Sequence, residues 1–120
     1  MELRRKRAYV TAESSDGFRV LVDRLWPRGV SKEDAAIDLW AKDTAPSPEL
    51  RKAWHAASDD DWDTYADRYR AELDGETAQA LDELAAEVKK RKTVTLVYAA
   101  HDDEHNHAVV LEQALRELLS

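Results

Sequence analysis

Two polar clusters contain most of the side chains in this sequence that could bind a ligand or move a proton. The first consists of Asp23, Arg24, Trp26 and Arg28. The second is the segment 101–107, which holds three of the four histidines. Guanidinium groups offer forked donors that suit phosphate or carboxylate, and an indole offers a flat face to a base or another ring. The first cluster therefore predicts a site for a small anionic or nucleotide-like ligand, bound by Arg24, Trp26 and Arg28.

The histidines predict proton transfer at the same place. One histidine oriented by Asp23 would be sufficient for general acid–base chemistry, so we predict Asp23, His105 and His107 as catalytic residues and Asn106 as a ligand-binding residue. Other interpretations stay open. Asp23 could pair with a neighbouring arginine, Trp26 could fill a gap under its loop, and Asn106 or Asp103 could satisfy free amides at a helix start.

A metal site is the third possibility. His105 and His107 are two residues apart, so they would diverge on a helix but could share a ligand in an extended loop, with a nearby carboxylate as the third group. The pattern leaves the metal, and any cofactor, unknown. The three glycines, at positions 17, 29 and 75, are too few for a dinucleotide fingerprint or a phosphate loop.

Other nucleophiles have little support. The chain contains no cysteine, which excludes a thiol nucleophile, a zinc–thiolate site and a disulfide framework. Ser31, Ser47 and Ser58 each precede a predicted helix and are typical of N-caps, and no Gly-x-Ser-x-Gly motif is present.

Both polar clusters follow predicted strands. The run from Phe18 places Val20, Leu21 and Val22 together, as in a buried strand, although a helix ended by Pro27 and Gly29 is the alternative. The segment 94–100, VTLVYAA, is the clearest strand. If these strands are parallel and adjacent, the two clusters face each other at the carboxyl edge of the sheet, where open α/β sheets bind ligands.

The remaining elements complete one domain over residues 1–120. Further strands are predicted in 3–10 and 37–40, and helices after Ser31, from Ser47 to about His55, from Ser58 to Gly75, over 78–88 and over 108–118. The expected fold is α/β, a small three-layer domain with a mostly parallel sheet of about four strands flanked by helices.

Composition limits the environment and the partners. No apolar stretch approaches the roughly 20 residues of a membrane span, and MELRRKR lacks the apolar core of a signal peptide, so we expect a cytoplasmic protein without a membrane partner. The net charge is −7, and residues 31–120 carry 11 basic against 21 acidic side chains. This acidity makes nucleic acid a less favoured partner than a small anion. The oligomeric state stays open.

Three segments carry a family resemblance: DGFRVLVDRLWPRG, KDTAPSPELRKAWH and VTLVYAAHDDEHNHAVVL. Together they resemble the YeaO-like proteins of the domain of unknown function 488 family, over essentially the whole chain. The resemblance implies a cytoplasmic bacterial or archaeal α/β protein and no particular reaction. Longer members have a late Cys-His-Arg element where this chain has His105-Asn106-His107, so no cysteine mechanism transfers. Relatives often carry lysine at the position of His101, which leaves the role of His101 open.

Two classes of function therefore remain. The favoured one is an enzyme acting on a small anionic or nucleotide-like substrate through arginine and histidine residues. The alternative is a non-catalytic nucleic-acid or protein binding module, and the sequence does not decide whether the chain is an enzyme. An interaction protein would need exposed tryptophans, whereas apolar neighbours at helix or strand spacing predict Trp40, Trp54 and Trp62 in the core.

Overall fold

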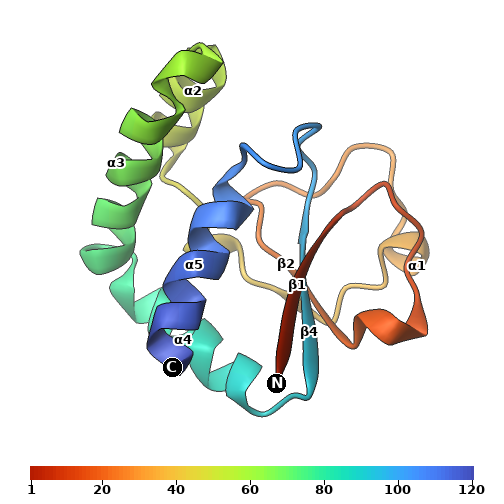
Figure 1. Cartoon of the computed structure of the whole chain (residues 1–120). Coiled ribbons are helices and arrows are strands. Elements are labelled where there is room, and N and C mark those ends of the chain that lie inside the picture. Colours follow the sequence, from red (N-terminus) through yellow and green to blue (C-terminus); the bar gives the residue numbers. More distant parts are fainter.

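The computed structural model describes all residues, 1–120, and shows an α/β fold built on a parallel sheet (Figure 1). The strands are β1 (Glu2–Arg7), β2 (Phe18–Leu21), β3 (Leu39–Trp40) and β4 (Thr93–Tyr98), in the order β1-β4-β2-β3. Every neighbouring pair is parallel. The predicted α/β class and sheet are confirmed, and the helical alternative for the run from Phe18 is wrong.

The apolar run of β4 is explained by its central position. β4 pairs with β1 on one side and with β2 on the other, and Val94, Leu96 and Val97 are completely buried. A strand covered on both faces has no solvent-facing side, so it needs apolar residues at consecutive positions. β3 is an edge strand of only two residues, shorter than the predicted segment 37–40.

Five helices connect and cover the strands. They are α1 (Lys32–Ala35), α2 (Pro48–Ala56), α3 (Trp62–Asp74), α4 (Ala78–Lys89) and α5 (His107–Leu119). Short 3-10 turns, η1 (Ser14–Asp16), η2 (Lys42–Thr44) and η3 (Asp59–Asp61), lie between them. The Oγ atoms of Ser31 and Ser47 accept the backbone N–H groups of Asp34 and Leu50, as N-caps do. Ser58 makes no such bond: it precedes η3, and α3 begins only at Trp62, so the cap predicted at Ser58 is wrong.

The two faces of the sheet are covered unequally. The main core includes Val20, Val94 and Leu96 from the strands and, from the helices, Tyr69 and Leu111 among others. Figure 1 places α3, α4 and α5 on one side of the sheet and the short α1 on the other. Ala8, Leu21 and Val97 form a small second cluster, and Trp26 and Ile37 pack against it. The third layer of the domain is thus made largely of loops.

The tryptophans divide between core and surface. Trp54 and Trp62 pack against the main core, as predicted. Trp40 was expected there as well, but it is 37% exposed because it lies on the edge strand β3. Its indole N–H instead donates to the backbone oxygen of Asp23 at 2.7 Å.

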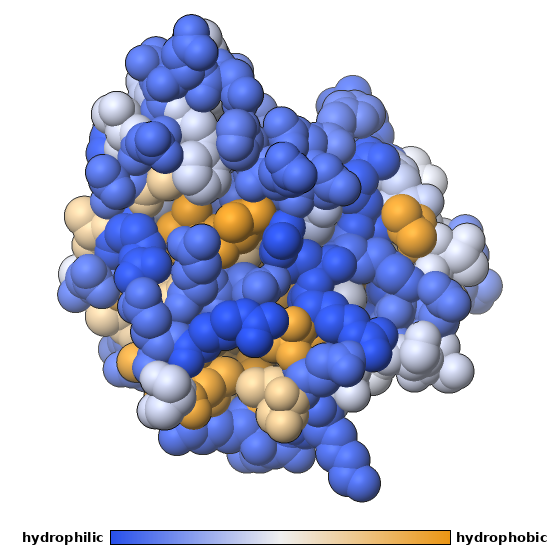
Figure 2. All heavy atoms as spheres, viewed as in Figure 1, coloured by the Kyte–Doolittle hydropathy of each residue, from blue (hydrophilic) through white to orange (hydrophobic).

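The outer surface fits the high content of charged residues. Figure 2 shows hydrophilic atoms over most of the face seen in Figure 1, with apolar atoms in small separate patches. None of the helices has both the length and the apolar character that crossing a membrane requires.

Candidate functional site

A cleft of about 600 Å³ lies at the carboxyl ends of β2 and β4. Because these strands are adjacent and parallel, the two polar clusters meet there. The seven residues predicted for the site all line this cleft: Asp23, Arg24, Trp26, Arg28, His105, Asn106 and His107. The geometry fits one shared site, and the individual chemical roles stay predictions.

The cleft has walls that the two clusters do not supply. Arg51, Trp54 and His55 line it from α2, and Tyr9 lines it from the loop after β1. The spacing of four between Arg51 and His55 is a signal that the sequence does contain, since it places both side chains on one helical face. Tyr9 has no such signal. It reaches the cleft because its hydroxyl donates to the backbone oxygen of Arg28 at 3.0 Å.

Asp23 and His107 form a pair at the cleft. His107 Nε2 lies 3.2 Å from Asp23 Oδ1 and 3.0 Å from the backbone oxygen of Val22. Both neighbours are acceptors, so we infer that Nε2 carries a hydrogen. The other carboxylate oxygen of Asp23 accepts the backbone N–H of Ala99 at 3.0 Å. The structure thus brings Asp23 to a histidine and pairs it with neither neighbouring arginine.

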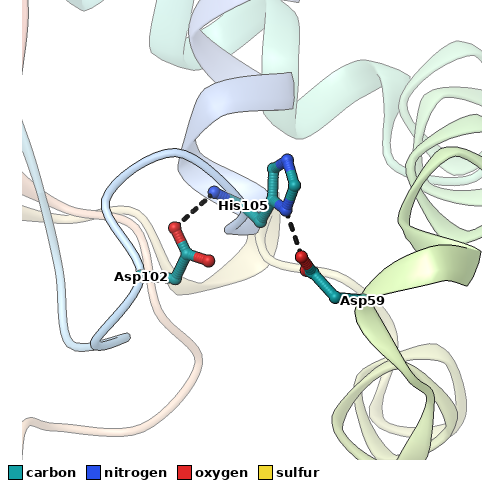
Figure 3. Close-up of side chains that lie close together, drawn as sticks. All are labelled: Asp59, Asp102 and His105. Atoms are coloured by element: carbon teal, nitrogen blue, oxygen red, sulfur yellow. Dashed lines mark hydrogen bonds and ion pairs between the residues drawn. The ribbon is translucent and has the colours of Figure 1, made fainter.

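His105 has a different partner. Its Nδ1 atom lies 2.8 Å from Asp59 Oδ1, and its ring stacks on Trp62 with 4.9 Å between centroids (Figure 3). A side-chain hydrogen bond with Asp59 is the main cause that raises the pKa of His105 above its usual value. Sequence reasoning missed Asp59, because this residue lies 46 positions away and only the tertiary fold brings it near.

The arginines of the first cluster differ in how their donors are used. Arg24 donates through Nε and Nη2 to the backbone oxygens of Ala45 and Pro46, over distances of 3.3–3.4 Å. Part of its guanidinium therefore holds the segment before α2. Arg28 is exposed. Charge of this kind at the mouth of a cleft is available to an incoming anion.

Trp26 combines a structural contact with a place in the cleft. Its indole N–H donates to the backbone oxygen of Val30 at 2.7 Å, and its ring meets Trp40 edge to face at 5.5 Å. The expectation that Trp26 supports its own loop agrees with these contacts. Its position in the cleft wall also permits contact with a ligand.

The loop before α5 is held by Asp102. Asp102 Oδ1 accepts the backbone N–H groups of Glu104 and His105, both at 2.9 Å, and these bonds lower the pKa of Asp102. The side chain that accepts these loop amides is therefore Asp102, and the prediction that Asn106 or Asp103 would do so is wrong. Asn106 is 5% exposed, makes no side-chain cap, and donates instead to the backbone oxygen of Asp102 at 2.7 Å.

The structure does not bring His105 and His107 together as ligands of one metal ion, as the sequence suggested. Asp59, Asp102 and His105 have one ligand atom each within 4.8 Å of one another. His107 is turned toward Val22 and Asp23 instead. The three clustered side chains are exposed and already bonded to protein groups, so we assign no metal to them.

The charge of the cleft is opposite to that of the chain. Its lining contains three arginines, all four histidines and only two carboxylates, whereas the chain carries a net charge of −7. A second hollow of about 370 Å³ is lined by Arg5, Lys6 and Arg7, among others. Arg5 and Lys6 are already paired with Glu112 and Asp16. The large cleft is therefore the stronger candidate for anion binding.

Fold and cleft define an α/β protein with a polar site at the carboxyl edge of its sheet. Residues 2–120 match the family model described as the inactive DUF488-N3 subclade. The chain therefore belongs to the YeaO-like DUF488 family.

Two relatives support this assignment. The chain is 45% identical over 118 residues to "Uncharacterized protein YeaO" of Escherichia coli (strain K12), covering 98% of this chain and 100% of that protein. It is 41% identical over 112 residues to "Uncharacterized protein Rv3073c" of Mycobacterium tuberculosis (strain ATCC 25618 / H37Rv), covering 91% and 89%. No solved structure matches the chain.

Proposed function

We propose that this protein binds a small anionic or nucleotide-like compound in the cleft at the carboxyl ends of β2 and β4. The observation that carries the proposal is the concentration of three arginines and all four histidines in one cleft of a chain with net charge −7. An excess of basic side chains in a cleft attracts anions, and here three arginines stand against the carboxylates of Asp23 and Asp102. A volume of about 600 Å³ is in the range of small-molecule sites.

Binding is favoured over catalysis. The matching subclade is described as inactive. In addition, His107 Nε2 already has an acceptor within the protein, the backbone oxygen of Val22 at 3.0 Å, with the Asp23 carboxylate 3.2 Å away. Proton transfer by Asp23, His105 and His107 therefore remains a prediction without further support.

A nucleic-acid partner is favoured less than a small anion. Neutralising many phosphates needs a continuous basic surface. Three of the 18 lysines and arginines line this cleft, and η3 beside it carries Asp59, Asp60 and Asp61, so the site does not form a continuous basic surface. The cleft is therefore better suited to one or a few anionic groups.

The test is a thermal-shift series with sulfate, phosphate and nucleoside monophosphates on the wild type, Arg28→Gln, Arg51→Gln and the control Arg68→Gln. Arg68 is exposed on α3 and does not line the cleft. A ligand that binds only the native state raises Tm with its concentration. We expect the Tm shift in the wild type and the control and a smaller shift in the two cleft variants. Equal shifts in all four proteins, or none with any anion, would refute the proposal.

A further inference from the structure

His105 connects the β4–α5 loop, which lines the cleft, with the corner between α2 and α3. It lies in the loop between β4 and α5, whereas its partner Asp59 lies in η3, between α2 and α3. Figure 3 shows Asp59 and the loop residues Asp102 and His105 converging from these two segments. The Nδ1–Oδ1 distance of 2.8 Å is that of a good hydrogen bond.

Each end of this connection is fixed to the protein. On the loop side, Asp102 accepts the backbone N–H of His105, which holds that residue in place. On the helix side, the ring of His105 stacks on Trp62 at the start of α3. The ring centroids of Trp62 and of Trp54 in α2 are in turn 6.4 Å apart. Trp54 lines the cleft together with Arg51 and His55. Two ring contacts therefore link His105 to the α2 wall.

We propose that His105 and Asp59 form a proton-operated clasp between the β4–α5 loop and the corner joining α2 to α3, and that this clasp regulates anion binding in the cleft. The regulatory part rests on the proposed function. The clasp itself rests on the contacts of His105 with Asp59 and Trp62. Closing it holds the α2 wall, with Arg51 and His55, against the rest of the site.

The charged groups around His105 determine the direction of the switch. Asp59 faces it from η3, Asp102 and Glu104 lie in its own loop, and the neutral ring of Trp62 lies beneath it. The three carboxylates favour the imidazolium form and raise the pKa of His105, with the Asp59 hydrogen bond as the largest cause. A raised pKa means that the charged clasp is complete at low pH and is lost as pH rises through the folded value.

Tryptophan emission provides a test of the clasp without any ligand. An imidazolium held on an indole face quenches its fluorescence, so deprotonation of His105 should increase the emission of Trp62. We expect the emission of the wild type to rise with pH. The midpoint should move to lower pH in Asp59→Asn, and the transition should be absent in His105→Gln.

The matched control is Asp60→Asn, which removes the same charge from the neighbouring position of η3. It should titrate like the wild type. The clasp is overturned if Asp59→Asn and Asp60→Asn show the same midpoint, or if His105→Gln retains the wild-type transition. All the substituted side chains are exposed, which limits effects on folding.

Sulfate affinity then tests the regulation. Sulfate keeps its charge between about pH 5 and about pH 8, where histidines titrate, so a change in affinity over this range reports on the protein. We expect sulfate to bind more weakly to the wild type as pH rises. The midpoint of this loss should lie at lower pH in Asp59→Asn and should be unchanged in Asp60→Asn.

The possible outcomes separate the two proposals. If sulfate binds with the same pH midpoint in all three proteins, the regulation is refuted and the proposed function stands. If the wild type binds no sulfate, phosphate or nucleotide at any pH, the proposed function fails together with its regulation. The fluorescence midpoints then decide whether the clasp exists.

Discussion

His107 Nε2 lies 3.2 Å from Asp23 Oδ1, and each side chain is 17% exposed. This pair joins the first turn of α5 to the segment that follows β2. Asp23 also accepts the backbone N–H of Ala99, so one carboxylate connects the segments that follow β2 and β4. Asp23 thus links the two segments that line the cleft after β2 and β4.

The substitution Asp23→Asn should reduce stability by about 1–3 kcal/mol, the usual cost of leaving a partly buried polar group badly paired. In asparagine one of the two carboxylate oxygens becomes an NH2 group, which then faces either the backbone N–H of Ala99 or Nε2 of His107, and both of these are donors. Urea unfolding measures the difference. Asp67→Asn, an exposed change on α3, is the control and should lie within about 0.5 kcal/mol of the wild type. Equal stability of the two variants would contradict the role given to Asp23.

The buried ion pairs of Asp16 should have a larger effect. Asp16 is 2% exposed, and its carboxylate contacts Lys6 Nζ at 2.8 Å and Arg19 Nη1 at 2.6 Å. Removing one partner of a buried pair leaves the other charge uncompensated. We expect Asp16→Asn to cost about 3–5 kcal/mol, against less than about 0.5 kcal/mol for the exposed control Asp82→Asn. Denaturant unfolding at neutral pH measures both variants. Similar losses of stability in Asp16→Asn and Asp82→Asn would contradict the role given to the Asp16 ion pairs.

The same residue predicts a dependence on pH. Burial raises the pKa of Asp16, but hydrogen bonds from Lys6, the backbone of Glu13 and Arg19 outweigh burial and hold that pKa below its ordinary value of 3.8. The stabilising contribution is therefore present above that value and is lost as pH falls through the lower folded pKa. The stability difference between the wild type and Asp16→Asn should narrow in acid. A difference that stays constant down to about pH 3 would contradict this explanation.

Two glycines with positive φ provide a matched pair of substitutions. Gly17 has φ of 67°, and a Cβ atom there would overlap the backbone oxygen of Thr93. Gly29 has φ of 80° and open space around the same position. Gly29→Ala should cost only the left-handed backbone strain, about 1–2 kcal/mol, and Gly17→Ala should cost clearly more. Chemical unfolding measures the stability of both variants. If Gly17→Ala destabilises the protein no more than Gly29→Ala does, the predicted overlap with the Thr93 backbone is excluded.

The hydroxyl of Tyr69 is a further structural contact near the site. This residue is fully buried, and its Oη donates to the backbone oxygen of Thr44. Burial raises the pKa of Tyr69, so the hydroxyl stays protonated and keeps donating at neutral pH. Tyr69→Phe should destabilise the protein by about 1–3 kcal/mol, because Thr44 loses its donor. The control Tyr65→Phe, on the same helix, should be nearly neutral, and thermal or urea unfolding of both proteins is the measurement.

Much of the fold could be predicted because its signals are local. The continuous apolar run from Val94 requires a strand covered on both faces, and Ser47 followed by Pro48 requires a helix start. Trp40 could not be placed in this way. Its exposure follows from the strand order, which puts β3 at the edge of the sheet, and strand order depends on how distant segments pair.

Part of the lining of the candidate cleft could be predicted from the sequence, because the ends of two apolar strands identify residues that gather at one edge of a parallel sheet. This sufficed to bring Asp23, Arg28 and His107 into one expected site. Only the tertiary structure decided the partners within it: His107 meets Asp23, whereas His105 turns to Asp59, 46 residues away. The physical reason is that hydrogen bonds and ring contacts act over a few ångströms, and those distances are set by the packing of whole helices against the sheet.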